Sequence, residues 1–157
     1  MKLISLVFSF RNEEKNLSEL VDRIKSTFEN LSDFNYELIF VNDASDDNSE
    51  SVLESLQINH PITIINMSRR FGNVPCVIAG FRHANGDAII YMDSDLQDPP
   101  EIIPKLIEEY LKGSDVVHTV RTKREGENKI KLIITKFAYK IINFLAVLEI
   151  QPKLFKI

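Results

Sequence analysis

The chain has 157 residues, a length that suits one domain, and its 44% hydrophobic and 27% charged residues are the balance of an ordinary globular protein. Its formal net charge of −4 argues against a nucleic-acid partner, and its single cysteine, Cys76, excludes an internal disulfide. The N-terminus lacks a signal-peptide pattern, and no apolar run reaches the ~18 residues that a membrane-spanning helix needs.

Apolar runs and helical spacing alternate along the chain. Runs rich in β-branched and aromatic residues predict five strands, at residues 3–10, 36–41, 61–67, 88–92 and 116–120. Apolar residues at helical spacing follow the first four strands, within residues 17–28, 52–56, 77–84 and 103–110. Residues 68–73 are polar and basic, which predicts a loop. This alternation favours an α/β fold with a mainly parallel sheet and helices on both faces.

Two acidic residues stand at the end of the fourth predicted strand. Asp93 and Asp95 are one residue apart, and Gln97 follows them before a proline pair opens the next helix. In open α/β sheets, ligands bind at the carboxyl ends of the strands. Two close carboxylates repel each other unless a hard cation such as Mg²⁺ binds between them, often together with phosphate oxygens. The stretch therefore favours a site for a metal ion and a diphosphate, with simple turn and cap chemistry as the alternative.

The last part of the chain has a different pattern. Residues 128–150 are strongly apolar, but Lys129, Lys136 and Lys140 recur at helical steps, which predicts a basic amphipathic helix. Three interpretations stay open: the helix packs on the sheet, lies on a membrane surface with its lysines facing anionic headgroups, or forms a partner interface. An exposed apolar helix also leaves a homo-oligomer open.

Short motifs occur in a fixed order at the ends of the predicted strands. They are Asn12-Glu13-Glu14, Val41 to Ser45, Ser68 to Gly72, Ala84 to Asp87, Met92 to Glu101, and Val120-Arg121 with Arg124 to Glu127. Together they resemble the N-terminal catalytic domain of the family-2 glycosyltransferases. The similarity is greatest to the polyprenyl-phosphate branch, which includes dolichyl-phosphate mannosyltransferases and bactoprenol glucosyltransferases. The resemblance implies a Rossmann-like GT-A fold, with residues 1–157 as a single catalytic domain.

The same resemblance implies which residues bind the sugar donor. Glu13 and Asp43 match positions at the base and ribose, Asp93 matches one at the sugar and ribose, and Asp95 matches the direct metal ligand. The implied nucleotide-sugar site comprises Ser9, Arg11, Glu13, Val41, Asp43, Asp93, Ser94, Asp95 and Arg121. The implied ligands of Mg²⁺ or Mn²⁺ are Asp95, Gln97 and Asp93.

Other interpretations of these residues stay open when they are judged without the resemblance. Glu13 is then a solvated charge at a helix start, and Asp43 is a turn or cap residue. Arg121 is either a phosphate contact or an ordinary surface arginine. The pair Arg69-Arg70 is either a further phosphate contact or part of a solvated loop.

The chain departs from the family pattern in two ways. Ser9 stands where the family usually has proline, and Arg11 stands where it usually has tyrosine, which puts an aromatic wall for the base in doubt. After Ile150, nothing matches the family's motif for the acceptor-side aspartate. We therefore expect a domain that is C-terminally shortened after the fifth strand, and we assign no catalytic base.

The expected function is transfer of a sugar from a UDP- or GDP-linked donor to an acceptor, with inversion and with help from Mg²⁺ or Mn²⁺. The resemblance implies a polyprenyl phosphate acceptor and a cytoplasmic location at the inner face of the cell membrane. The alternative is a non-catalytic nucleotide-sugar-binding module, or a degenerate fragment that lacks the acceptor site.

Overall fold

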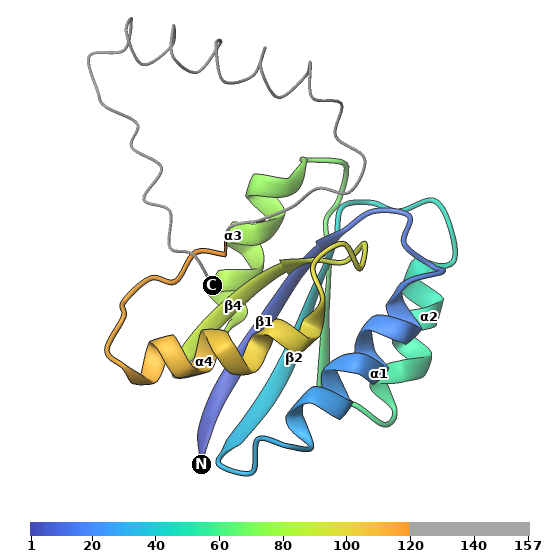
Figure 1. Cartoon of the computed structure of the whole chain (residues 1–157). Helices are drawn as coiled ribbons and strands as arrows, with labels where there is room; N and C mark the ends of the chain where they lie inside the picture. Colours follow the sequence, from blue (N-terminus) through green and yellow to red (C-terminus); the bar gives the residue numbers. More distant parts are fainter. Residues whose placement is uncertain (120–157) are drawn as a thin grey trace, which may run out of the picture. The chain divides into compact units, whose positions relative to one another are not determined.

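A parallel sheet of four strands in the order β3-β2-β1-β4 forms the centre of residues 1–114 (Figure 1). We describe it from a computed structural model, in which residues 1–119 are described. The strands are β1 (Lys2–Phe10), β2 (Phe34–Asn42), β3 (Ile62–Asn66) and β4 (Ala88–Asp93). These four strands confirm the first four predicted ones and the parallel α/β class.

Each strand is followed by a helical segment, because a parallel neighbour can be reached only by a crossover. The helices are α1 (Leu17–Phe28), α2 (Ser49–Gln57), α3 (Asn73–His83) and α4 (Ile103–Leu111), with a short 3-10 helix η1 (Pro100–Ile102) before α4. β1 lies between β2 and β4 and has helices packed on both of its faces, so its residues 4–8 are fully buried. This burial explains why β1 is a continuous apolar run rather than an alternating one.

The two faces of the sheet are covered by different helices (Figure 1). On one face, Phe8 and Phe40 stack with ring centroids 4.8 Å apart inside a core that also takes residues from α1, α2 and α4. On the other face, a smaller core joins Val7, Ile39 and Val41 to Cys76 of α3. The prediction of helices on both faces is confirmed, and α3 alone covers the second face among the helices of residues 1–114.

The predicted fifth strand is wrong over the part that the structure describes. Residues 116–119 are not in a strand, and Val116 is 71% exposed. β-branched residues favour a strand only where a neighbouring strand packs beside it and supplies hydrogen bonds. Arg121 and the predicted helix at 128–150 lie outside the described residues.

The start of α3 also differs from the prediction. The helix begins at Asn73, four residues before the predicted start at Val77, so the loop ends at Gly72. Gly72 is the N-cap residue and has φ +88°, which glycine adopts without strain. Pro75 lies in the first helical turn, where its missing N–H costs nothing because that turn has no internal acceptor. None of the helices described in residues 1–119 is long and apolar enough to cross a membrane.

Close packing of α3 on the sheet depends on Gly80. A Cβ at this position would clash with Val7 Cγ1 and would lie 3.2 Å from Val41 Cγ2. Gly80→Ala should therefore lower the free energy of unfolding by about 1–3 kcal/mol, although alanine normally favours a helix. Urea unfolding followed by circular dichroism measures this. Ser51→Ala, at an exposed position of α2, is the control; equal midpoints for both variants would contradict the packing argument.

Candidate functional site

The register of the sheet brings three strand ends to one edge. Ser9 of β1 pairs with Val41 of β2 on one side and with Asp93 of β4 on the other. Residues that are far apart in sequence therefore lie side by side at the carboxyl ends of the strands, where open α/β sheets bind ligands. Val41 itself is fully buried, so its side chain is not exposed to a ligand.

The chain leaves β4 through a tight turn that carries the acidic pair. Asp95 Oδ1 accepts a hydrogen bond from the Gln97 N–H at 3.0 Å, and Leu96 between them has φ +60°. Ser94 is 4% exposed, and its Oγ lies 3.5 Å from the Ser9 carbonyl oxygen. The turn thus directs Ser94 into the protein, while Asp93 and Asp95 remain partly exposed on either side of it.

Tyr91 holds Asp93 in place. Its hydroxyl donates to Asp93 Oδ1 at 2.7 Å and also lies 3.1 Å from Asn73 Oδ1 at the start of α3. Burial, the hydrogen bond to Asp93 and the charges of Asp93 and Asp95 raise the pKa of Tyr91 to about 12. Tyr91 is therefore a protonated donor at neutral pH. Sequence reasoning missed it, although residues 91 and 93 of a strand share one face.

Asp43 anchors the loop that precedes α3. Its Oδ1 accepts from the Phe71 N–H at 2.6 Å and its Oδ2 from the Gly72 N–H at 2.9 Å, and the residue is 6% exposed. Burial acts to raise the pKa of this carboxyl, but the two backbone donors, the Cys76 thiol and the charge of Arg70 outweigh it and lower the pKa. Asp43 is thus an ionised residue that ties the end of β2 to residues 68–72.

Cys76 lies beneath this edge on α3. Burial and the neighbouring Asp43 carboxylate raise the pKa of its thiol, while a hydrogen bond with Ser9 acts in the opposite direction. A protonated, buried thiol is a poor nucleophile. Cys76 therefore interacts with the Asp43 carboxylate, and Ser9, at the position that the family fills with proline, interacts with the same thiol.

Arg11 braces the neighbouring loop. Its Nη1 donates to the carbonyl oxygens of Asp43, at 3.0 Å, and Ala44, and its Nη2 lies 3.4 Å from Asp46 Oδ2. Ala44 has φ +53°, a backbone conformation that non-glycine residues adopt at some cost unless contacts such as these hold it. Arg11 is thus engaged with the protein's own backbone.

Glu13 is placed at the start of α1. Its Oε2 accepts from Asn16 Nδ2 at 2.6 Å, and its backbone N–H donates to Ser49 Oγ at 2.9 Å. These bonds match the interpretation of Glu13 as a helix-start residue. They leave Glu13 partly exposed, beside the loop that Arg11 braces.

The oxygen atoms around the β4 turn suit a hard divalent cation. Asp93, Asp95 and Gln97 offer two carboxylates and one amide, the oxygen ligands that Mg²⁺ or Mn²⁺ takes. Within residues 1–119, no group of three or more His, Cys, Asp or Glu side chains could hold a metal by itself. This donor set fits an ion that shares its coordination with phosphate oxygens and water, and does not fit a closed structural metal site.

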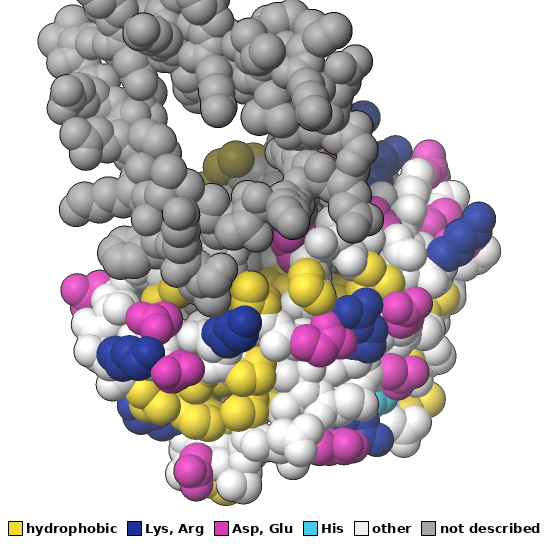
Figure 2. Space-filling model, viewed as in Figure 1, with side chains coloured by type: hydrophobic (Ala, Val, Ile, Leu, Met, Phe, Trp, Pro, Cys, Tyr) yellow, Lys and Arg dark blue, Asp and Glu magenta, His cyan; other side chains and the backbone are white. Residues whose placement is uncertain are grey.

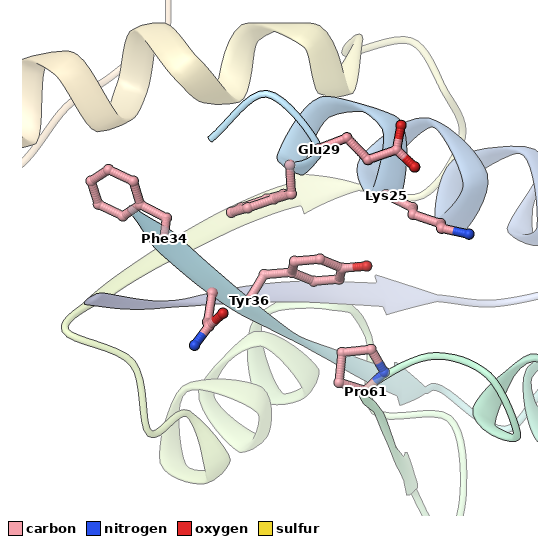
Figure 3. A pocket seen from close by; sticks show the side chains of 7 residues that line it. Lys25, Glu29, Phe34, Tyr36 and Pro61 are labelled. Carbon is pink, nitrogen blue, oxygen red and sulfur yellow. The ribbon is translucent and has the colours of Figure 1, made fainter. Parts of the chain in front are cut away.

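A separate hollow lies at the opposite edge of the sheet (Figure 3). It has a volume of about 380 Å³ and is lined by Lys25, Phe28, Glu29, Phe34, Asn35, Tyr36 and Pro61. Phe34 and Tyr36 belong to the first half of β2, whereas the acidic turn follows the carboxyl end of β4. This hollow therefore does not belong to the candidate site.

Comparison with known proteins identifies the family. Residues 5–155 match the family model described as glycosyl transferase family 2. The chain belongs to glycosyltransferase family 2. The sheet described above is therefore the sheet of a family-2 domain, and the resemblance drawn from the sequence motifs is confirmed.

Two relatives belong to the polyprenyl-phosphate branch by name. The chain is 38% identical over 141 residues to a prophage bactoprenol glucosyl transferase homolog of Escherichia coli, covering 89% of this chain and 46% of the relative. It is 37% identical over 147 residues to undecaprenyl-phosphate 4-deoxy-4-formamido-L-arabinose transferase of Salmonella choleraesuis, covering 92% of this chain and 43% of that protein. The chain thus spans about half the length of the curated relatives that it matches.

A solved structure shows the same fold. The mannosyltransferase PcManGT of Pyrobaculum calidifontis, in complex with GDP-Man and Mn²⁺, superposes with a TM-score of 0.58 at 22% identity. The match covers 69% of this chain and 32% of that one. The expected GT-A fold is confirmed by this likeness.

The role of Asp43 as an anchor can be tested without a ligand. Asp43→Asn keeps one acceptor oxygen but loses the other, so the amides of Phe71 and Gly72 should exchange their hydrogens about tenfold faster or more, since a bond to a charged acceptor is worth about 1.5–3 kcal/mol. Native-state hydrogen exchange by NMR measures this. Asp46→Asn is the matched control, because Asp46 is 71% exposed and contacts Arg11 at 3.4 Å.

The same variant has a pH signature. A lowered pKa in the folded state means that the contribution of Asp43 to stability is complete above its unfolded pKa, about 3.9, and is lost as pH falls through the folded value. Asp43→Asn should therefore unfold with less acid dependence than the wild type. If the Phe71 and Gly72 amides exchanged at equal rates in Asp43→Asn and Asp46→Asn, and both variants had the same acid dependence of unfolding, the anchor role would be contradicted.

Proposed function

We propose that this chain carries the donor-binding edge of a glycosyltransferase that passes a sugar from a nucleotide-diphosphate donor to a polyprenyl phosphate. The observation that supports it best is the juxtaposition of Ser9, Val41 and Asp93 in register at one sheet edge of a family-2 domain. Inversion at the anomeric carbon in a single displacement follows from the resemblance of the motifs.

The acidic turn would bind the diphosphate of the donor. Asp95 would be the direct ligand of a Mg²⁺ or Mn²⁺ ion, with Gln97 beside it, and Asp93 would face the sugar and ribose. Such an ion stabilises negative charge on the departing diphosphate as a Lewis acid. Tyr91 keeps Asp93 oriented at 2.7 Å and remains protonated, so Asp93 need not reorganise when the donor arrives.

The nucleoside would lie over the ends of β1 and β2. Asp43 already accepts two backbone N–H bonds, but a carboxylate has about four acceptor sites, so a ribose hydroxyl can still bind it. Arg11 is held by backbone carbonyls, and Glu13 stands partly exposed next to it. We propose that these residues give a polar wall for the base in place of the aromatic wall typical of the family, with Arg121 as a further candidate at the phosphates.

The names of the relatives support a polyprenyl phosphate acceptor, and with it a location at the cytoplasmic face of a membrane. An acceptor phosphate is already ionised at neutral pH, since the second pKa of a phosphate monoester is about 6. It therefore needs little deprotonation. This chemistry makes fewer demands on a general base than transfer to a sugar hydroxyl would make.

Donor binding can be tested by thermal denaturation. The panel contains UDP, GDP and their sugars, each with and without Mn²⁺. One nucleotide and its sugar should raise the melting temperature only when the metal is present. A ligand at 100 times its Kd adds about 2.7 kcal/mol to the free energy of unfolding. Asp95→Ala should abolish the metal-dependent part. Asp22→Asn, an exposed carboxylate on α1, is the matched control. The same metal-dependent shift in the Asp95 variant would rule out the proposed ligand.

Turnover requires a second measurement. Radiolabelled donor sugars, a polyprenyl phosphate and Mg²⁺ or Mn²⁺ should yield a labelled product that partitions into organic solvent, and Asp95→Ala should lower its rate by about a hundredfold or more, the scale of losing electrostatic stabilisation of a transition state. Metal-dependent nucleotide binding without transfer or donor hydrolysis would contradict the transferase and support a binding module.

A further inference from the structure

Helix α3 has apolar side chains on two opposite faces. Cys76 and Gly80 face the sheet and are buried. The opposite side carries Val74, Ile78 and Phe81, which are 69%, 50% and 43% exposed and recur at i, i+4 and i+7 along one helical face. Phe71, directly before the helix, is 39% exposed. We call Phe71, Val74, Ile78 and Phe81 the α3 outer face.

The segment that carries the α3 outer face has basic residues and no acidic ones. Residues 67–86 contain three arginines, Arg69, Arg70 and Arg82, and no aspartate or glutamate, although the whole chain has 23 acidic and 19 basic residues. All three arginines are exposed. The guanidinium carbon of Arg69 lies 4.2 Å from the ring centroid of Phe71, so cation and aromatic ring form one amphipathic unit.

The opposite side of the sheet has a different surface. Figure 2 shows acidic and basic side chains intermixed around the hydrophobic ones on the side that carries α1 and α4. Ion pairs such as Arg23–Glu101, at 2.7 Å, and Lys112–Glu108, at 2.8 Å, neutralise charge there. Exposed apolar side chains accompanied by basic residues and by no acidic residue are therefore a property of residues 67–86, which carry α3.

We propose that the α3 outer face docks on an anionic lipid surface. Phe71, Val74, Ile78 and Phe81 would enter the headgroup boundary while the three arginines pair with lipid phosphates, the arrangement of interfacial amphipathic helices. This inference rests on the proposed function for its purpose, because a polyprenyl phosphate acceptor is reached only at a membrane. It concerns a different surface from the basic pattern at 128–150.

The α3 outer face is rigidly linked to the donor edge. Phe71 N–H and the adjacent Gly72 N–H are bound by Asp43 at 2.6 and 2.9 Å, and Asn73 lies 3.1 Å from the Tyr91 hydroxyl that holds Asp93. A lipid surface in contact with Phe71 would therefore lie beside the edge that carries Asp43 and Asp93. An acceptor phosphate at headgroup level would approach that edge without leaving the membrane.

A second copy of the chain fits this face less well. In a two-fold symmetric contact through α3, the arginines would face arginines, and like charges across an interface are unfavourable. Four side chains also fall short of the ~800 Å² per partner of a stable protein interface. Negative lipid headgroups are complementary to the same residues.

The test is co-sedimentation of the 157-residue chain with vesicles of phosphatidylglycerol and phosphatidylcholine, compared with phosphatidylcholine alone, at 50 and 500 mM NaCl. The chain should bind the anionic vesicles at low salt. The triple variant Val74→Ser, Ile78→Ser, Phe81→Ser should bind at least about tenfold less. The triple variant Arg69→Gln, Arg70→Gln, Arg82→Gln should bind about a hundredfold less, since about 1 kcal/mol for each basic residue near the surface sums to about 3 kcal/mol.

Control variants carry changes of the same kind elsewhere, two apolar residues in one and three basic residues in the other. Ile58→Ser with Leu111→Ser removes apolar side chains that are 82% and 56% exposed away from α3, and Lys15→Gln, Lys25→Gln, Lys105→Gln removes the same charge from exposed positions. Both controls should bind like the wild type. Circular dichroism confirms folding, and the arginine set gives a second test if the apolar set unfolds.

Several outcomes would overturn the proposal. Equal vesicle binding by all variants would assign binding to another part of the chain. Equal binding to anionic and neutral vesicles would contradict an anionic lipid partner. A dimer in analytical ultracentrifugation that is lost in the α3 apolar variant would assign the face to a second copy of the chain. Metal-dependent nucleotide binding is measured on the same samples. Loss of vesicle binding with nucleotide binding retained therefore tests α3 alone, whereas absence of nucleotide binding in the wild type tests the proposed function.

Discussion

The candidate site depends on the hydrogen bonds that the Asp43 carboxylate accepts from the loop before α3. The carboxylate joins the end of β2 to the Phe71 and Gly72 amides, at 2.6 and 2.9 Å, and these residues open α3. Without an acceptor, two N–H groups would lack partners at a loop that glycine makes flexible. Because the carboxylate is almost fully buried, its charge must be balanced by these donors, and the same bonds keep it ionised. The same two hydrogen bonds therefore fix the position of the loop before α3 and keep Asp43 ionised.

The layout of the strands was readable in the sequence, because burial leaves a local pattern. Residues 4–8 of β1 are apolar except for Ser5, because both faces of a central parallel strand are covered. The acidic pair was found because it directly follows the apolar run of β4. The fifth strand failed for the converse reason, since β-branched residues mark what packs well in a strand and do not specify a partner. The strand predictions were therefore right where burial determined the local pattern, and wrong where the pattern depended on a neighbouring strand that the sequence does not specify.

The site's supporting contacts could not be predicted, because they join residues distant in sequence. Asp43 and Phe71 are 28 positions apart, and Arg11 reaches carbonyls 32 and 33 positions away. No spacing rule links such residues. The contact from Tyr91 to Asp93 is the exception, because residues two positions apart in a strand share one face, so their spacing could have indicated it. Arg11 is the clearest example of a contact that could not be predicted: as a departure from the family's tyrosine it predicted only a missing aromatic ring, whereas the structure shows what the guanidinium does instead, which is to hold a loop whose Ala44 has φ +53°.

Helix α3 shows why one element can serve both the site and a surface. Gly80 lets it lie so close to Val7 and Val41 that its inner face needs only a small side chain, Cys76, to complete the packing. The larger apolar residues of the helix are therefore not required inside, and they stand outside at 43–69% exposure, where they are a cost unless something covers them. The inner contact fixes the helix relative to Asp43 and Tyr91, so whatever covers the outer face is held at a constant distance from the donor edge. The proposed membrane-bound acceptor would need this geometry, because its phosphate cannot travel far from the headgroup layer to meet the sugar.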